Sequence, residues 1–460
     1  MNPILLIDFG STYTKVTAVD TDAPAILGTG GAHTTVTTDV GEGLEVALSQ
    51  LHAQTGPLEY RARYACSSAA GGLRMIACGL VPSLTVEAAK RAALGAGAKI
   101  VKVYSYELTD EDAAEIGAVN PDILLLTGGT DGGNRENILQ NAGMLAGVPG
   151  NFPIVIAGNR AASGQCAKLL KGSGHEVIVC ENVMPVFNKL NIAPVQGVIR
   201  ELFLRRIVHA KGLSRQQSLI DGIMMPTPAA VMRALELLSA GPSGKEGMGD
   251  LVAVDLGGAT TDVYSIADGL PSGAATLLHG LPEPHAKRTV EGDIGMRYSA
   301  SGVLDAAGMD KLSLLSGLSA PEVEVLLAQI AASPDILPQG EDALFKLDFA
   351  LASAAVELGL IRHSGTLEQV YTPTGPVYQQ AGKDLTRVSA MVLTGGALIY
   401  SGQAEKIATY AMQSMDEPAS LKPRTARILL DKRYILASMG LLSGAYPEAA
   451  FRIMQTELAI

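Results

Sequence analysis

The stretch ILLIDFGSTYTK, residues 4–15, decides the fold, because its plan recurs as LVAVDLGGATTD at residues 251–262. Each copy has an apolar run, an aspartate, one apolar residue and a glycine, followed by small polar residues and a second β-prone run. Two such runs joined by a glycine-containing turn predict a β-hairpin. The sequence therefore predicts one hairpin that contains Asp8 and another that contains Asp255.

A second pair of similar segments occurs in the same order. Residues 123–129 read ILLLTGG, and residues 391–397 read MVLTGGA. Two unrelated motifs that recur in one order at similar spacing indicate a duplicated domain. We therefore predict a first lobe over residues 1–240 and a second lobe over residues 250–460, separated by a segment whose glycines and proline break the pattern.

The segments between these motifs predict an α/β fold. From residue 100 to residue 179, short apolar runs alternate with helix-like stretches. The apolar runs are nearly continuous, as expected for strands of a sheet that is buried on both faces. We expect residues 183–213 to form a mostly helical insertion in the first lobe, and residues 226–238 to form a helix that closes it. In the second lobe, we expect helices over residues 306–332 and 342–363.

The composition limits the classes of partner. At 460 residues the chain is longer than one ordinary core, and its formal net charge is −11. This charge argues against a nucleic acid or an anionic membrane as the main partner. No signal-like N-terminus and no apolar run of membrane-spanning length occurs, so we expect a soluble, cytoplasmic protein. The four cysteines are widely spaced and are expected to be buried small hydrophobes.

The predicted hairpins have the chemistry of phosphate-binding turns. A turn of glycine, serine and threonine offers several backbone N–H groups, which together bind phosphate oxygens. An aspartate beside such a turn repels phosphate directly but can hold a Mg²⁺ ion through water. We therefore expect Asp8 and Asp255 to hold Mg²⁺, and Lys15 to reach a phosphate. In isolation, Asp8 could equally cap a turn, and Lys15 could be a solvated strand residue.

Two glycine-rich segments follow predicted strands. Gly395 and Gly396 end a strand and open toward a helix, where the backbone can approach a flat ligand such as adenosine. The segment TGGTDGG, residues 127–133, is the counterpart in the first lobe and contains more glycines. Either a tight strand-to-helix turn or a partner-facing loop fits this segment. Neither GxxxxGK[ST] nor a strand followed by GxGxxG occurs, which excludes a P-loop and a dinucleotide-binding fold.

The three motifs together resemble those of a known superfamily. Asp-x-Gly-Ser at residue 8, Asp-x-Gly-Gly-x-Thr-x-Asp at residue 255 and Gly-Gly-Ala at residue 395 are similar to the phosphate-1, phosphate-2 and adenosine motifs of actins, heat-shock chaperones and sugar kinases. The resemblance implies the actin-like ATPase fold, which has duplicated ribonuclease H-like lobes. It also implies that ATP and Mg²⁺ bind in the cleft between the lobes.

The chain resembles one family within this superfamily more closely. The segments IDFGSTYTK (residues 7–15), LTGGTDGG (residues 126–133) and VEGDIGMR (residues 290–297) are similar to those of the GlmL (MutL) family. Its members are accessory proteins of the adenosylcobalamin-dependent glutamate mutase and are distinct from the mismatch-repair MutL. The family is thought to act as a chaperone or reactivase, driving exchange of damaged cobalamin with ATP. The resemblance therefore implies a weak ATPase whose partner is a cobalamin-dependent mutase.

The resemblance also assigns roles to individual residues. Asp8 and Asp255 would position Mg²⁺ and the attacking water. The remaining predicted residues would contact the nucleotide through two phosphate turns and an adenosine turn: Gly10, Ser11, Thr12 and Lys15; Gly257, Gly258 and Thr260; Gly395 and Gly396.

One position departs from the pattern of the chaperones. They carry a carboxylate just before the proline of the helix near residue 226, where it orients water, and this chain has Met225 there. The departure implies slow hydrolysis, or an acid elsewhere that takes over. We consider Asp293 as that acid, with a simple turn residue as the alternative.

Three other functions of the same fold were weighed against the reactivase. A small-molecule kinase ranks second, because it needs a catalytic base and only Asp262, Asp268 and Asp293 offer one in the second lobe. Filament formation has no positive signal in the sequence, although some oligomer is possible. An iron–sulfur activator is disfavoured because all four cysteines fall in the first predicted lobe.

Overall fold

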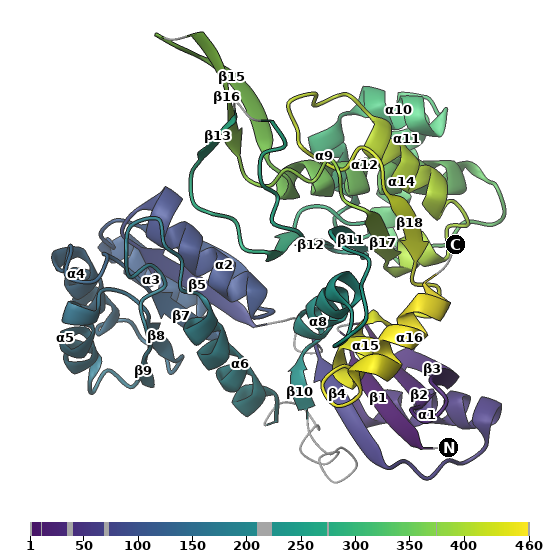
Figure 1. The fold of residues 1–460 in the computed structure, drawn as a ribbon, viewed down its shortest axis with the longest axis horizontal. Coiled ribbons are helices and arrows are strands. Elements are labelled where there is room, and N and C mark those ends of the chain that lie inside the picture. Colours follow the sequence, from purple (N-terminus) through teal and green to yellow (C-terminus); the bar gives the residue numbers. More distant parts are fainter. Residues whose placement is uncertain are drawn as a thin grey trace. The chain divides into compact units, whose positions relative to one another are not determined.

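The computed structural model describes residues 2–10, 12–34, 40–68, 73–208, 223–273, 276–373 and 375–458 (Figure 1). The chain divides into two compact units, each assembled from three segments. Unit 1 comprises Met1–Arg233, Gly280–Pro282 and Ala437–Ala450. Unit 2 comprises Ala234–His279, Glu283–Leu436 and Phe451–Ile460.

The first sheet of unit 1 begins with the predicted hairpin. Three successive strands pair antiparallel, and two later strands add in parallel beside the first, giving the order β10-β4-β1-β2-β3. The strands are β1 (Pro3–Phe9), β2 (Tyr13–Asp20), β3 (Ala25–His33), β4 (Ala62–Ser67) and β10 (Ile223–Pro226). Helix α1 (Val40–Thr55) packs on β2 and β3.

The main sheet of unit 2 has the same plan. Its order is β14-β12-β11-β17-β18, again a meander of three antiparallel strands with two parallel strands beside the first. The strands are β11 (Leu251–Leu256), β12 (Thr261–Ile266), β14 (Ala286–Glu291), β17 (Ala390–Thr394) and β18 (Arg427–Leu430). This order is that of a ribonuclease H-like sheet, so the predicted α/β fold with two such lobes is confirmed.

Unit 1 contains a second sheet, and the first of the two similar segments, residues 123–129, lies in it. It is fully parallel, with the order β6-β5-β7-β8-β9, and its chain segment lies between β4 and β10. The strands are β5 (Arg74–Gly79), β6 (Lys99–Ser105), β7 (Ile123–Leu126), β8 (Ile154–Ile156) and β9 (Val177–Val179). Its connecting helices are η1 (Pro82–Val86), α2 (Glu87–Gly95), α3 (Asp110–Val119), α4 (Glu136–Leu145) and α5 (Arg160–Leu170).

The match between residues 123–129 and 391–397 is therefore not a product of the duplication. β7 precedes the first glycine pair but belongs to the parallel sheet, whereas β17 precedes the second and belongs to the ribonuclease H-like sheet. The structural counterpart of β17 in unit 1 is β4, because each is the parallel neighbour of the first strand. The two glycine pairs also lead to different structures: β17 is followed almost directly by the short helix α13, whereas residues 127–135 separate β7 from α4.

Helix α6 (Ala193–Val208) lies within the stretch that we expected to be an insertion. Its residues Ile199, Leu202 and Phe203 are buried in the same apolar cluster as Leu5 of β1 and Met75 of β5. The helix therefore belongs to the core of unit 1, while residues 209–213 of the expected insertion lie outside the described residues.

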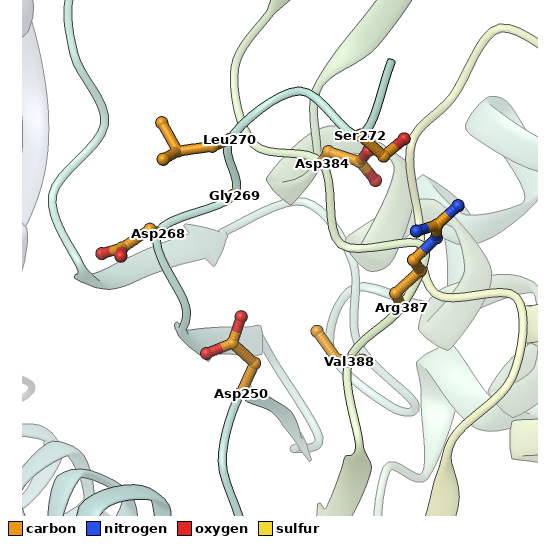
Figure 2. A pocket seen from close by; sticks show the side chains of 8 residues that line it. All are labelled: Asp250, Asp268, Gly269, Leu270, Ser272, Asp384, Arg387 and Val388. Atoms are coloured by element: carbon orange, nitrogen blue, oxygen red, sulfur yellow. The ribbon is translucent and has the colours of Figure 1, made fainter. Parts of the chain in front are cut away.

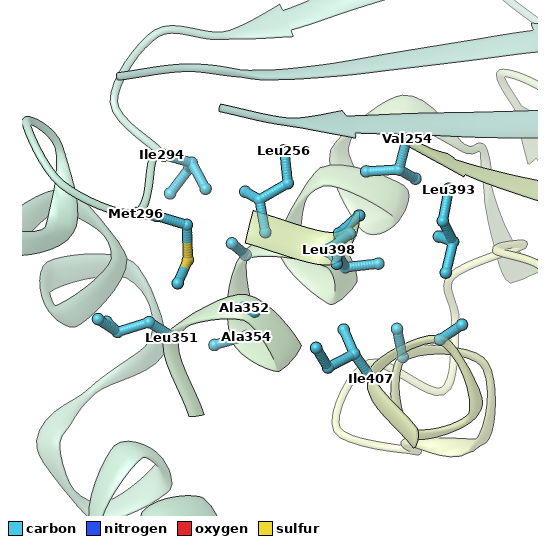
Figure 3. Close-up of a cluster of buried hydrophobic side chains, with 14 of the residues drawn as sticks. Val254, Leu256, Ile294, Met296, Leu351, Ala352, Ala354, Leu393, Leu398 and Ile407 are labelled. Carbon is cyan, nitrogen blue, oxygen red and sulfur yellow. The ribbon is translucent and has the colours of Figure 1, made fainter. Parts of the chain in front are cut away.

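The core of unit 2 lies between its sheet and helices α12 (Ala343–His363) and α14 (Ala404–Gln413) (Figure 3). Val254 and Leu256 of β11 pack with Leu351 of α12 and Ile407 of α14. The alanines of α12 let this helix lie close to the strands. The other helices from α8 onward are α8 (Thr227–Ala240), α9 (Ala300–Ala307), α10 (Met309–Ser316), α11 (Ala320–Ala332), α13 (Gly396–Ile399), α15 (Leu436–Leu442) and α16 (Pro447–Glu457).

Two expectations for unit 2 were incomplete. The helix expected over residues 306–332 is divided, because Gly308 and Gly317 have positive φ angles of 86° and 67° that end helices. A small sheet of order β13-β16-β15 was not expected; it contains β13 (Thr276–His279), β15 (Thr366–Thr372) and β16 (Gly375–Ala381).

Within the described ranges no single helix is long and apolar enough to cross a membrane. Helices α10 and α11, which are bent by 95° relative to each other, meet that test only as a pair.

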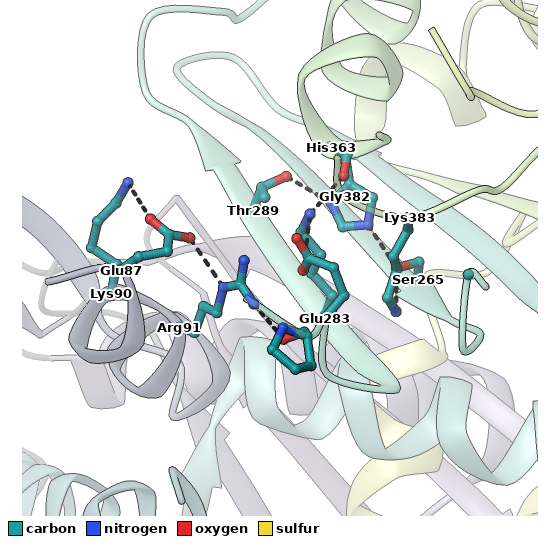
Figure 4. A network of polar contacts seen from close by, with 12 residues as sticks. Glu87, Lys90, Arg91, Ser265, Glu283, Thr289, His363, Gly382 and Lys383 are labelled. Atoms are coloured by element: carbon teal, nitrogen blue, oxygen red, sulfur yellow. Dashed lines mark hydrogen bonds and ion pairs between the residues drawn. The ribbon is translucent and has the colours of Figure 1, made fainter. Parts of the chain in front are cut away.

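A polar network is buried in unit 2, where α12 ends beside β12 and β14 (Figure 4). The His363 ring nitrogens lie 2.8 Å from Ser265 Oγ and 2.9 Å from Thr289 Oγ1. Lys383, which is fully buried, donates to the His285 carbonyl at 2.7 Å and to Ser265 Oγ at 3.2 Å. Burial lowers the pKa of Lys383 to about 7 and holds the pKa of His363 well below its usual value.

The buried Lys383 should make unfolding depend on pH above neutrality. Its pKa is lower in the folded chain than in the unfolded chain, so above pH 7 the unfolded chain binds more protons and stability rises with pH. Between pH 7 and pH 9 we expect wild type to gain about 2 kcal/mol more unfolding free energy than K383M, measured by urea unfolding. The exposed K432M serves as the control and should match wild type; equal pH dependence of K383M and wild type would contradict the assignment.

Candidate functional site

The first hairpin places Asp8 at the end of a central strand. Asp8 lies opposite Lys15 on β2 and beside Cys66 on β4, and its side chain is only 5% exposed. Gly10 closes the turn by donating its N–H to the Tyr13 carbonyl at 3.0 Å. A Cβ on Gly10 would lie 2.5 Å from that oxygen, so this tight turn requires glycine.

The other predicted residues of this hairpin differ in how exposed they are. Thr12 is exposed on the turn, and its carbonyl accepts a hydrogen bond from the Thr34 N–H at 2.8 Å. Lys15 is half-buried on β2. Ser11 lies outside the described residues. The turn is therefore built as expected, and the roles of Ser11, Thr12 and Lys15 stay predictions.

Asp8 has two hydrogen-bond donors that the sequence did not reveal. Thr227, the first residue of α8, donates from Oγ1 to Asp8 Oδ1 at 2.6 Å. Cys66 donates from Sγ to the same oxygen at 3.4 Å. Burial and the neighbouring Asp8 raise the pKa of the Cys66 thiol well above its usual value, so the thiol stays protonated and can donate. Met225, where we noted the missing carboxylate, pairs with Cys66 in the sheet.

The second hairpin is braced by a segment far along the chain. The Gly257 N–H donates to the Thr260 carbonyl at 3.0 Å, which closes the turn. The Gly257 carbonyl accepts from the Met296 N–H at 3.0 Å, and the Gly258 carbonyl accepts from the N–H groups of Arg297 and Tyr298 at 2.8 and 2.9 Å. The segment 290–297, noted above only for its resemblance, therefore supports this turn.

Asp255 and the glycine turn after β17 meet in unit 2. β11 pairs with β17 in parallel, which sets Asp255 beside Thr394. Gly395 has a φ of 95°, and a Cβ there would lie 2.3 Å from the Leu256 carbonyl oxygen and 2.8 Å from Asp255 Oδ1. Two motifs that are 140 residues apart in sequence are thus adjacent, and Gly395 leaves room for the carboxylate.

The space beside Gly396 is bordered by tyrosines. A Cβ on Gly396 would have only ordinary contacts, at 3.8 Å from Tyr400 and 3.9 Å from the Tyr434 hydroxyl. Burial, together with the charges of Asp255 and Asp431, raises the pKa of Tyr434 well above its usual value, so the phenol is neutral. An open backbone beside aromatic side chains fits the adenosine role that we predicted for this turn.

Asp431 is a further residue that the sequence did not reveal. It is 1% exposed and follows β18. It accepts hydrogen bonds from Thr394 Oγ1 at 3.2 Å and from the N–H groups of Ile435 and Leu436 at 2.8 and 3.2 Å. Asp431 therefore ties the end of β17 to the start of α15 and helps to fix the glycine turn.

Two of the three acids considered as general bases are ion-paired, and the third lies beside a histidine ring. Asp293 contacts Arg362 at 2.9 Å, and this guanidinium lowers the pKa of the carboxyl group. Asp262 contacts the buried Arg288 at 2.5 Å. Asp268 lies 2.8 Å from the His285 ring. Pairing with a cation weakens a carboxylate as a proton acceptor, so this geometry does not favour Asp293 as the water-activating acid.

Mg²⁺ fits these residues only together with phosphate. No cluster of three or more potential metal-ligating side chains occurs among the residues that the structure describes. Nucleotide-bound Mg²⁺, however, takes most of its ligands from phosphates and water and needs only one or two carboxylates. Each unit contributes one such carboxylate, Asp8 in unit 1 and Asp255 in unit 2, and their role in holding Mg²⁺ stays a prediction.

A pocket of about 230 Å³ lies elsewhere in unit 2 (Figure 2). The carboxylates of Asp250, Asp268 and Asp384 and the guanidinium of Arg387 border it. None of the predicted nucleotide-binding residues lines this pocket, so we do not assign it to the predicted site.

Comparisons with known proteins agree with the sequence resemblance. A family model described as MutL protein matches residues 4–458. Protein MutL of Clostridium tetanomorphum is 47% identical over 460 residues, which cover 100% of this chain and 99% of that protein.

Several solved structures are similar at low scores. A diol dehydratase-reactivating factor in nucleotide-free form has a TM-score of 0.37 and 12% identity, covering 97% of this chain and 100% of its own. A glycerol dehydratase reactivase has a TM-score of 0.36 and 10% identity, covering 96% and 99%. Xylulose kinase from Bifidobacterium adolescentis has a TM-score of 0.33 and 14% identity, covering 99% and 94%. These scores carry no conclusion about function.

Replacing Gly395 should lower the stability of the fold by more than the strain of its positive φ angle alone would. We expect G395A to lose about 3 kcal/mol of unfolding free energy, because the methyl group would meet a carbonyl oxygen and displace Asp255. G402A is the matched control, because Gly402 has a φ of 65° and open space around its Cβ, so about 1 kcal/mol should be lost. Equal losses in the two variants, measured by urea unfolding, would refute the close contact.

Proposed function

Because the chain belongs to the MutL family, we propose that it is an ATP-dependent reactivating factor, or chaperone, for an adenosylcobalamin-dependent mutase of the glutamate mutase type. In this proposal it binds ATP with Mg²⁺ and hydrolyses the nucleotide slowly. One observation carries the nucleotide part of the proposal. Both units place an aspartate at the end of the first strand of a ribonuclease H-like sheet, directly before a glycine turn.

The residues of the two turns supply complementary contacts. The N–H groups and hydroxyls of Gly10, Ser11 and Thr12 would bind phosphate oxygens, and Lys15 would add a positive charge. Gly257, Gly258 and Thr260 would form the second phosphate turn. Gly395 and Gly396 would lie against the adenosine, with Tyr400 and Tyr434 beside them.

Asp8 and Asp255 would hold Mg²⁺ through water and orient the attacking water. The bound ion would neutralise phosphate charge and polarise the phosphoryl group. Asp8 Oδ1 already accepts hydrogen bonds from Thr227 and Cys66, which fixes the direction of the carboxylate. Preorganised groups of this kind contribute to phosphoryl transfer by positioning and by electrostatic stabilisation.

Slow hydrolysis is supported by the contacts of the acids considered as bases, since none of the three is free in the described part of the chain. Met225 stands where the resemblance implies a water-orienting carboxylate, Asp262 and Asp293 are ion-paired, and Asp268 lies 2.8 Å from the His285 ring. A slow ATPase suits a protein whose nucleotide state controls a partner, since a long-lived ATP state gives time for exchange. The same lack of a base counts against a small-molecule kinase, the alternative function, which needs one to activate a substrate hydroxyl.

The partner would be the subunits of the cobalamin-dependent mutase, encountered in the cytoplasm. The net charge of −11 is unfavourable for nucleic acid or an anionic membrane as a competing partner. Oligomer formation remains compatible with the proposal. A pull-down of the mutase that ATP releases would support it, whereas efficient phosphorylation of a sugar or acyl substrate would favour the kinase.

Removing either aspartate charge should abolish ATP hydrolysis. We expect D8N and D255N to lower turnover at least a hundredfold, because each loses the carboxylate that positions Mg²⁺ and water. A phosphate-release assay at saturating ATP measures the effect. D268N, which removes an exposed carboxylate outside the predicted site, is the control and should hydrolyse like wild type. Wild-type rates in D8N and D255N would refute the site.

A further inference from the structure

The junction between β10 and α8 is fixed where it meets Asp8. Pro226 ends β10, and a Cβ on Gly97 would lie 2.8 Å from its ring. After this close contact, Ala230 of α8 is fully buried, and its carbonyl oxygen would lie 1.8 Å from a Cβ on Gly440. Thr227 lies between these two packed positions in sequence, so the backbone that carries its side chain is held in place.

The hydroxyl of Thr227 is directed at one oxygen of Asp8. The distance from Thr227 Oγ1 to Asp8 Oδ1 is 2.6 Å, which is typical of a charge-assisted hydrogen bond between a hydroxyl and a carboxylate. Cys66 Sγ adds a second donor to the same Oδ1. Among the described residues, no donor contacts Asp8 Oδ2. The two oxygens of Asp8 are therefore unequal: one is bound within the protein and the other is left for a different partner.

We infer that Thr227 positions Asp8 so that Oδ2 faces the water shell of nucleotide-bound Mg²⁺. This inference rests on the proposed function. Both carboxylate oxygens are coplanar, so a hydrogen bond that fixes Oδ1 also fixes Oδ2. Without it, the side chain of Asp8 could rotate about its last torsion, which is broad for aspartate. Thr227 is thus a positioning residue that acts through Asp8.

This role differs from that of the carboxylate that Met225 replaces. A carboxylate before the proline can orient or activate water, whereas a threonine hydroxyl two positions later is neutral and donates to Asp8. Thr227 therefore supports binding of the metal–nucleotide complex but supplies no base. Its removal should change the Mg²⁺ dependence of nucleotide binding more than the maximal rate of hydrolysis.

The test compares T227V and T227S in Mg²⁺ titrations of fluorescent ATP binding to the full-length chain. We expect T227V to need about tenfold more Mg²⁺ for half-saturation, the effect of about one lost charge-assisted hydrogen bond. T227S keeps the hydroxyl and should restore the wild-type dependence to within about twofold. At saturating Mg²⁺, turnover of T227V should return to within about threefold of wild type, because no base has been removed.

T17V is the matched control. Thr17 is a buried threonine in the same sheet, and its hydroxyl contacts Ser438 Oγ at 3.2 Å. Losing that hydroxyl should leave the Mg²⁺ dependence unchanged. If T227V does not fold, as judged by circular dichroism, T227A replaces it. In a D8N background, the Thr227 substitution should have no further effect on Mg²⁺ dependence.

The outcomes distinguish failure of the proposed function from failure of the role of Thr227. A wild-type chain that shows no Mg²⁺-dependent nucleotide binding overturns the proposed function, and the role of Thr227 with it. A wild-type chain that binds, together with a T227V chain of unchanged Mg²⁺ dependence, overturns the role of Thr227 alone. An equal effect of T17V and T227V would also overturn it, since that effect would be general to the sheet.

Discussion

The structure depends on placing a carboxylate at the end of a buried strand. Burying an ionised group is costly unless hydrogen bonds replace its lost water. In unit 1 the replacement comes from Thr227 and Cys66, which lie on the two parallel strands beyond β1 or directly after them. In unit 2, Gly395 provides room for Asp255 at the end of the neighbouring parallel strand. In each sheet, the strand order therefore places the groups that accommodate the aspartate next to the end of the first strand.

The two units have diverged around this shared arrangement. In unit 2 the chain reaches the parallel strand β17 after helices α9 to α12, and the glycine turn follows that strand directly. In unit 1 the strand β4 follows α1, and a whole parallel sheet is inserted before β10 returns. The insertion adds a separate apolar cluster built on the other face of this parallel sheet, with Ile76 and Leu124 among its members. The conserved element of the duplication is thus the hairpin and not the material around it.

The sequence was sufficient for features that depend on neighbouring residues. Both hairpins and the strand-to-glycine turn at Gly395 have local patterns, because turn geometry restricts residue type within a few positions. Thr227 and Asp431 could not be identified in this way, since their partners lie far away in sequence and a lone threonine or aspartate has no distinctive context. The resemblance between residues 123–129 and 391–397 misled for a related reason. Both segments are buried parallel strands followed by a glycine with a positive φ angle, at Gly128 and at Gly395, so similar local requirements gave similar residues in different sheets.

The composition of unit 1 has a consequence for how the chain is made. The unit contains the N-terminal strands and also Ala437–Ala450, where Ser438 contacts Thr17 on β2 and Gly440 packs against α8. Strands β1 to β4 cannot complete their sheet until β10 is present, and residues 437–450, which pack on the same unit, lie about 200 residues further along the chain than β10. Contacts between such distant segments slow folding and leave apolar surface uncovered meanwhile. Unit 1 therefore cannot finish folding before the segment from residue 437 to residue 450 has been made.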